Sequence, residues 1–163
     1  MGGKMEDRCT QINAALEENL TRTISFFNKL TPQQLETAVY EGELEWTARQ
    51  ILAHFATIEA TMHWLFKDLQ AGGPGSPPDF DVDRFNRTQV GKLDDLELAA
   101  LIEKFKSVRR ETMAIVSQMS DSDLDREGRH AFHGHGKLER FIHWTYEHVD
   151  LHIEDIRKAI DPS

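Results

Sequence analysis

Two histidines near the end of the chain have the spacing of a metal-binding pair. His148 and His152 are four residues apart, so on a helix their side chains project from the same face, about one turn from each other. Two imidazoles in this arrangement can bind one metal ion. The same spacing also occurs on solvated helix faces, and the neighbouring residues distinguish these two interpretations.

The segment around this pair has an apolar stripe that places both histidines at the edge of a core. The stripe has helical spacing and consists of Leu138, Ile142, Thr145, Val149, Ile153, Ile156 and Ile160. By the ~100° step per residue, His148 and His152 lie roughly 60–90° from its centre. His143 lies on the opposite side with the charged residues. Two histidines that face inward require polar partners or a ligand.

A third histidine, His54, lies at the edge of a second apolar stripe. The helical segment that begins at Trp46-Thr47 buries Ile51, Leu52, Phe55, Ile58, Met62, Leu65, Phe66 and Leu69. His63 and Trp64 point away from this stripe. Alone, His54 fits a hydrogen-bonded histidine near a core. Together with His148 and His152 it forms a set of three imidazoles, which leaves coordination positions free for water or substrate, as in a reactive metal site.

Four long amphipathic segments would position these side chains. They span about residues 5–30, 47–69, 95–119 and 137–160, with apolar residues at intervals of three and four. Thr47 is expected to cap the second helix, and Asp94 or Asp95 the third. Four such helices with short or moderate connections are typical of a four-helix bundle. We therefore predict an all-α fold in one domain, residues 1–163.

The connecting segments are less regular. Thr31-Pro32 has the form of a helix start and predicts a short helix that ends near residue 42. Residues 70–79 are rich in glycine and proline and predict a loop. Residues 81–91 predict a turn or short helix, with Phe80, Val82 and Phe85 packed against the bundle. No segment has the pattern of a β-strand.

Residues 127–136 contain three further histidines, His130, His133 and His135, together with three glycines. Their spacing is compatible with a second metal site. A glycine-rich, solvated loop explains the same pattern more simply, and we favour that interpretation.

The composition narrows the class of partner. The 163 residues carry a formal net charge of −9, which argues against nucleic acid or an anionic membrane as the main partner. A single cysteine, Cys9, excludes an intramolecular disulfide and suits a reducing compartment. The sequence has neither a run near ~18 apolar residues nor the apolar segment of a signal peptide. We expect a cytoplasmic protein.

The residues from Trp46 to His54 (WTARQILAH) resemble the helix-two signature of the DinB-like superfamily, which ends in the first histidine ligand. His148 and His152 match the pair that supplies the other two ligands in that superfamily. The resemblance implies a four-helix bundle, often a homodimer, that holds a divalent ion, zinc or nickel, on three histidines. These would be His54, His148 and His152 here.

The resemblance also implies an activity. Relatives such as bacillithiol transferases and mycothiol-dependent maleylpyruvate isomerases use the ion with a low-molecular-weight thiol. We expect a metal-dependent transferase or hydrolase in which the ion activates a thiol or water against a small-molecule substrate. The sequence departs from many relatives after the last ligand, where Ile153-Glu154-Asp155 replaces Arg-Gly-Gln, and at Thr57, which replaces an acid.

Two alternatives remain open. One is a small-ligand or stress-response binding module that keeps the bundle and its ion without catalysis. The other is a bundle without metal, in which the histidines are hydrogen-bonded residues at the edge of the core.

Several further residues are candidates for support of the site. Metal-bound imidazoles usually donate their second N–H to a carboxylate or carbonyl, and the carboxylates near the three histidines are Glu59, Glu147, Asp150 and Asp155. Aromatic residues either line the mouth of the site or only pack, and they are Tyr40, Trp144 and Tyr146. The outward Trp64 on a charged protein suggests a surface for a second copy of the chain.

Overall fold

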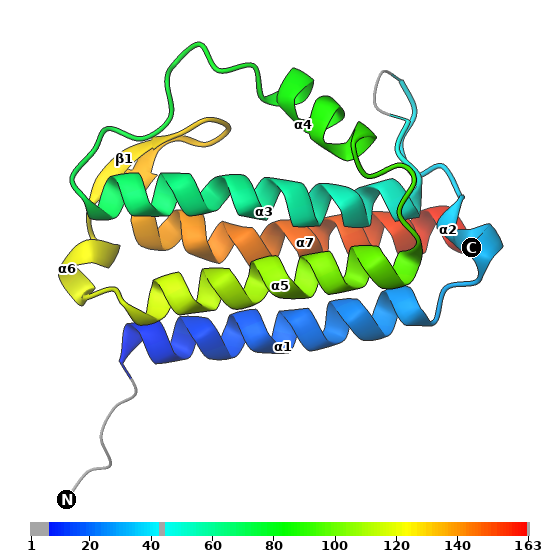
Figure 1. Ribbon diagram of the computed structural model, residues 1–163, viewed down its shortest axis with the longest axis horizontal. Helices are drawn as coiled ribbons and strands as arrows, with labels where there is room; N and C mark the ends of the chain where they lie inside the picture. The colour runs from blue at the N-terminus through cyan, green and yellow to red at the C-terminus, as the bar shows by residue number, and fades with distance from the viewer. Residues whose placement is uncertain (1–6, 43–44, 163) are drawn as a thin grey trace, which may run out of the picture.

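The computed structural model describes residues 7–42 and 45–162. Its four long helices are α1 (Arg8–Asn28), α3 (Ala48–Gln70), α5 (Leu98–Ser117) and α7 (Leu138–Ile160). α1 and α3 each pack against both α5 and α7, and all four lie side by side in Figure 1. The predicted four-helix bundle is therefore confirmed. None of the described helices is long and apolar enough to cross a membrane.

The order of the helices requires one long crossover. In Figure 1, α3 and α5 run in the same direction, and α1 and α7 run in the opposite direction. Parallel neighbours cannot be joined by a tight turn, so the chain returns along the bundle between them. The returning segment contains α4 (Val82–Gly91), which packs on α3. This crossover begins with the predicted glycine- and proline-rich loop.

Local capping sets most of the helix starts. Thr47 accepts a hydrogen bond from the Gln50 amide at 3.2 Å, and the Gln50 side chain accepts from the Thr47 amide at 3.0 Å. This reciprocal capping box satisfies two free N–H groups, and equivalent boxes open α2 (Pro32–Leu35) and α6 (Asp121–Leu124). The expected start of the third long helix at Asp94 or Asp95 is wrong, because α5 begins after Glu97 without a side-chain cap.

The segment predicted to be a loop at 127–136 is instead a β-hairpin. β1 (Glu127–His130) pairs antiparallel with β2 (Gly134–Lys137). The hairpin is also attached to the crossover, since the Arg129 amide donates to the Pro74 carbonyl at 2.9 Å. Gly75 lies so close that a Cβ there would come within 2.4 Å of the Arg129 carbonyl oxygen, and its φ of +87° also favours glycine. Tertiary contact thus supports strands that lack an alternating pattern.

The structure tests three predictions about which side chains are exposed and which are buried. Trp64 is 54% exposed, as predicted, but Phe80 is 40% exposed and does not pack down as expected. His63, predicted to point away from the core, is buried. Its Nε2 atom lies 2.7 Å from the Thr112 hydroxyl of α5, because α5 covers the side of α3 that the sequence pattern leaves outside the apolar stripe.

The apolar core is divided into two clusters. One contains Phe27, Phe55 and Phe105, and the other contains Phe66 and Phe141. Where the two clusters meet along the four long helices, the buried residues are polar, and we call this set the polar layer: Asn19, Glu59, Arg109, Thr112 and Thr145.

Candidate metal site

The structure brings together the three histidines that the sequence singled out. His148 Nε2 lies 3.3 Å from His54 Nε2 and 2.9 Å from His152 Nε2. The three candidate ligand atoms all lie within 4.8 Å of one another. Within residues 7–42 and 45–162, no other group of three or more histidine, cysteine or acidic side chains has such a geometry.

Two antiparallel helices build this cluster. His54 lies in the second turn of α3, and His148 and His152 lie one turn apart on the facing side of α7. Aromatic rings surround the imidazoles: the Trp46 ring lies 4.8 Å from that of His54, and the Trp144 ring stacks on His148 at 4.4 Å. These rings limit the access of water to the cluster and fix the orientation of the imidazoles.

Burial keeps the cluster in the neutral form that a metal ion requires. It lowers the pKa of His54 to about 3, with a further contribution from His152. Burial also lowers the pKa of His148 well below its ordinary value. For His152, burial lowers the pKa while Asp155 partly opposes the effect. Near neutral pH, the three imidazoles are thus uncharged and can offer nitrogen lone pairs.

A hydrogen-bond chain fixes the tautomer of His152. The Tyr40 hydroxyl donates to Asp155 Oδ2 at 2.7 Å and lies 2.5 Å from His152 Nδ1. An ionised carboxylate only accepts hydrogen bonds, so the Tyr40 hydrogen points to Asp155 and its oxygen accepts from His152 Nδ1–H. The Nε2 lone pair of His152 is then left for the cluster, as in metal-bound histidines that donate through their other nitrogen.

Tyr40 remains protonated in this chain, because burial and the Asp155 carboxylate raise its pKa. Its position depends on a short bridge that precedes α3, in which the Val39 amide donates to the Trp46 carbonyl at 2.9 Å. Tyr40 therefore contacts the site, whereas the hydroxyl of Tyr146 pairs with His143, outside the cluster.

The remaining carboxylates proposed as partners have different positions. Asp150 accepts from Asn19 at 2.9 Å and pairs with Arg22 at 3.7 Å, and Glu147 is exposed. Among the described residues, the buried Nδ1 atom of His54 has no hydrogen-bond partner.

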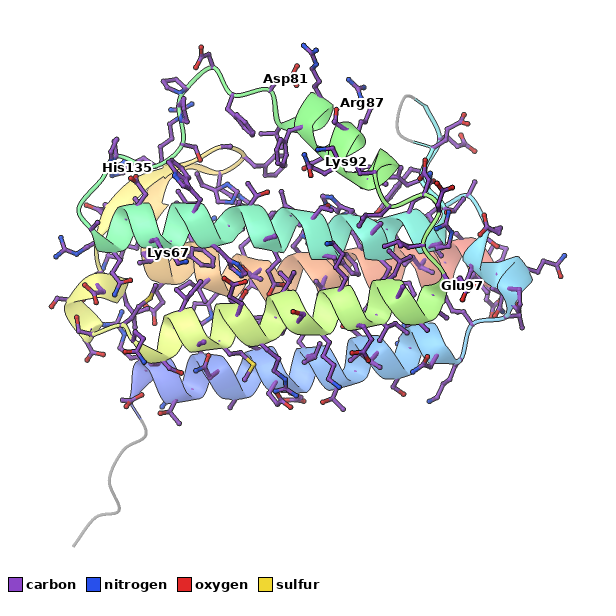
Figure 2. The ribbon with its side chains drawn as sticks, viewed as in Figure 1. Lys67, Asp81, Arg87, Lys92, Glu97 and His135 are labelled. Carbon is purple, nitrogen blue, oxygen red and sulfur yellow. The ribbon has the colours of Figure 1, made fainter. Side chains whose placement is uncertain are left out.

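The hairpin histidines form part of a turn. His130 is buried, and its Nδ1 atom accepts from the amides of Phe132 at 3.0 Å and His133 at 3.1 Å. Burial lowers its pKa to about 4, so the neutral ring carries its proton on Nε2. Both ring nitrogens are then unsuited to a metal ion. The expected solvent exposure is wrong for His130 but holds for His135, which lies in β2 with a side chain that is 69% exposed (Figure 2).

A buried ion pair in the polar layer lies close to the cluster. Arg109 is fully buried, and its Nε atom donates to Glu59 Oε2 at 2.9 Å. Thr112 also donates to Glu59 Oε2, at 2.7 Å. Sequence reasoning named Glu59 but missed Arg109. The available signal was spacing, since Arg109 continues the apolar face that contains Phe105 and Val116.

A pocket of about 340 Å³ adjoins the cluster through Trp144, which lines the pocket and stacks on His148. Its volume is in the range of small-molecule sites. Charged and titratable side chains make up most of the lining: His133, Lys137, Glu139, Arg140, His143 and Glu147.

Comparison with known proteins supports the fold. No curated protein matches the chain. Among solved structures, YfiT from Bacillus subtilis, described as a probable metal-dependent hydrolase with an unusual four-helix bundle topology, is 17% identical with a TM-score of 0.76. The alignment covers 98% of this chain and 90% of YfiT.

Two uncharacterised proteins have a similar fold. One, from Escherichia coli UTI89, is 16% identical with a TM-score of 0.68 and covers 92% of this chain and 91% of its own. The other, from Clostridium difficile 630, is 15% identical with a TM-score of 0.68, over 95% and 96% of the two chains.

A family model covers most of the chain, including all three histidines of the cluster. The model for the DinB superfamily matches residues 15–156. This match agrees with the resemblance carried by the segment from Trp46 to His54 and by the pair in α7. The chain therefore belongs to the DinB superfamily.

Proposed function

We propose that this protein is a metal-dependent hydrolase or thiol-dependent transferase that holds one zinc or nickel ion on His54, His148 and His152. The observation that carries the proposal is the convergence of three neutral imidazole Nε2 atoms, one of which has its tautomer fixed by Tyr40 and Asp155. The description of YfiT as a probable metal-dependent hydrolase is consistent with it.

The donor set fits a reactive divalent ion better than a structural one. Three histidines leave at least one coordination position for water, thiol or substrate. A bound ion of this kind acts as a Lewis acid, lowering the pKa of a coordinated water or thiol towards neutrality. Imidazoles that are already neutral need little proton loss before they bind a cation.

The protein's own residues orient and shield this site. Tyr40 holds the His152 ring and keeps its Nδ1 proton in place, while Asp155 accepts the Tyr40 hydrogen. Trp46 and Trp144 exclude water on two sides. The adjoining pocket, with its charged lining, is where we expect a polar small-molecule substrate to bind.

Metal content tests the ligand assignment. We expect about one zinc or nickel ion per chain in the purified protein, by elemental analysis after dialysis. His54→Ala removes one of three ligands and should lower affinity by more than the 10–100-fold typical of an outer partner. The matched control is His143→Ala, because His143 lies outside the cluster and contacts Tyr146. Full metal content in the His54→Ala variant would refute the assignment.

Measurements of turnover distinguish a catalytic protein from a non-catalytic binding module. A hydrolase would release product from ester or amide substrates with water alone, and a transferase would require a low-molecular-weight thiol. Activity of either kind should disappear after chelation and return with zinc or nickel. Metal and small-molecule binding without turnover over such panels would favour the non-catalytic binding module.

A further inference from the structure

The polar layer reaches the candidate metal site through a small cavity. The cavity has a volume of about 10 Å³, which is about the space that one water molecule needs. Three of its lining residues are polar, namely Glu59, Thr145 and His148. The others are Phe55, Ile58, Met62, Trp144 and Val149. A buried water is stable where it has two to four polar partners, and these three side chains are the candidates for that role.

A metal-bound His148 would require a hydrogen-bond acceptor at its second ring nitrogen. Its Nε2 atom faces His54 and His152, so a metal-bound His148 carries its proton on Nδ1. Such a ring usually donates this N–H to a carboxylate, a carbonyl or a water. The hydrogen bonds that His148 makes to described residues are those of Nε2. A water would therefore have to link His148 Nδ1 to a hydrogen-bond acceptor.

Glu59 is a carboxylate that buried donors hold in place. Its Oε1 atom accepts from Arg109 Nε at 3.1 Å and Nη2 at 3.0 Å, and its Oε2 atom accepts from Arg109 Nε at 2.9 Å and Thr112 at 2.7 Å. The Nε–H is shared between both oxygens, so these four contacts use three hydrogens. An ionised carboxylate offers about four acceptor positions, and a water that donates to Glu59 would take over one half of the shared Nε–H contact.

Arg109 is the buried ion-pair partner of this carboxylate. The guanidinium is fully buried and also donates to the Leu16 carbonyl at 2.9 Å and to Asn19 Oδ1 at 3.0 Å. Its remaining donors are thus fixed by α1, and it cannot turn away from Glu59 without losing buried hydrogen bonds. The other acids near the cluster have different partners, since Asp155 accepts a hydrogen bond from Tyr40 and Asp150 accepts one from Asn19.

We propose that Glu59 is a positioning residue for the metal site and acts on His148 through one water in this cavity. The water accepts from His148 Nδ1–H and donates to the Glu59 carboxylate, with Thr145 as the third polar neighbour. The negative charge makes His148 a more basic ligand and fixes its ring. This inference rests on the proposed metal site and adds that Glu59, in the polar layer of the bundle, supports that site.

The test compares metal affinity after the same change at a buried and at an exposed glutamate. Glu59→Gln keeps the shape of the side chain but removes the charge, and we expect zinc to bind roughly 10–100-fold more weakly in competition with a chromophoric chelator. The matched control is Glu17→Gln, which makes the same change at an exposed carboxylate of α1 that pairs with Arg110 outside the polar layer. This control should bind zinc with nearly wild-type affinity.

A spectroscopic readout separates positioning from general damage. In the zinc form, the imidazole Nδ1–H resonance of His148 should shift in Glu59→Gln, whereas that of His152, which donates to Tyr40, should not. Equal affinities in Glu59→Gln and wild type, or equal shifts at both histidines, would overturn the inference. A wild-type protein that binds no metal would instead overturn the proposed function.

Loss of folding in Glu59→Gln would not end the test. The double variant Glu59→Gln/Arg109→Met removes the buried ion pair as a unit, which proteins often tolerate, and it should show the same loss of zinc affinity. A high-resolution crystal structure of the zinc-bound wild type is independent of any variant. Electron density for a water between His148 Nδ1 and Glu59 would support the proposal, and its absence there would overturn it.

Discussion

Tyr40 determines which ring nitrogen of His152 carries the proton. The three imidazoles of the cluster turn nitrogen atoms towards one another, so each ring needs a hydrogen-bond partner that fixes which nitrogen carries its proton. The chain from His152 through Tyr40 to Asp155 decides this for one ring. Because the hydroxyl has a raised pKa, it stays a neutral connector over the physiological range and does not serve as a base.

Removal of the Tyr40 hydroxyl should therefore weaken metal binding without destroying it. For Tyr40→Phe we expect about a tenfold loss of zinc affinity, as for other outer partners of metal-bound histidines. The matched control is Tyr146→Phe, which removes a hydroxyl paired with His143 outside the cluster. Chelator competition measures both. Equal affinity in the two variants would show that Tyr40 does not support the site.

The sequence predicted the three histidines but not all of their partners, for physical reasons. His148 and His152 follow helical spacing, and His54 lies on an apolar stripe, so periodicity places all three. Tyr40 lies in an irregular segment between α2 and α3, where no period gives a direction. Arg109 continues a helical face but carries a charge, and charges are usually assigned to solvent. Its burial depends on Glu59 and Asn19 from other helices.

The β-hairpin is the element that sequence analysis missed most clearly. Helix starts follow from local capping boxes, such as that of Thr47 and Gln50, and local signals of this kind are visible in sequence. The strands depend instead on contacts with the crossover at Gly75 and on the His130 side chain inside the turn. Such tertiary contacts join distant segments and leave no periodic signal.

His130 should make the stability of the hairpin dependent on pH. The folded pKa of His130 is about 4, against an ordinary value of 6.5. Between these values the unfolded chain takes up a proton that the folded chain does not, so stability falls as pH decreases from about 6.5 towards 4. We expect this effect to lower the free energy of unfolding by about 1–3 kcal/mol at pH 4 and to be absent above pH 7.

Melting temperatures of metal-stripped protein between pH 7 and 4 measure this contribution. The comparison is with His130→Asn, whose side-chain oxygen can still accept from the turn amides but does not titrate. Other buried histidines remain in the variant, so its melting temperature should still fall, with a smaller slope. Melting temperatures that fall with the same slope against pH in the two proteins would contradict a role for His130.

At the scale of the whole molecule, Trp64 presents a large apolar side chain to solvent on α3. It is 54% exposed on a chain with a formal net charge of −9, and aromatic residues are enriched in protein interfaces. We expect the protein to form a homodimer that includes this residue. Light scattering at micromolar concentration should give twice the chain mass, and Trp64→Arg should shift it towards the monomer.

The control for this prediction is Leu151→Arg, which changes another exposed apolar residue, on α7. A dimer that survives Trp64→Arg but not Leu151→Arg would move the interface to α7. A monomer mass for the wild-type protein would leave Trp64 as an isolated exposed aromatic, and such residues are common.

The arrangement of the cluster on α3 and α7 also orders events during synthesis. Proteins are made from the N-terminus onward, so His54 leaves the ribosome long before His148 and His152. α3 can pack on α5 before α7 is made, yet the three nitrogens meet only when α7 is complete and lies against α3. A nascent chain thus carries only one of the three candidate ligands until α7 is made. For the proposed metal site, loading of the ion would therefore be a late step that requires the finished fold.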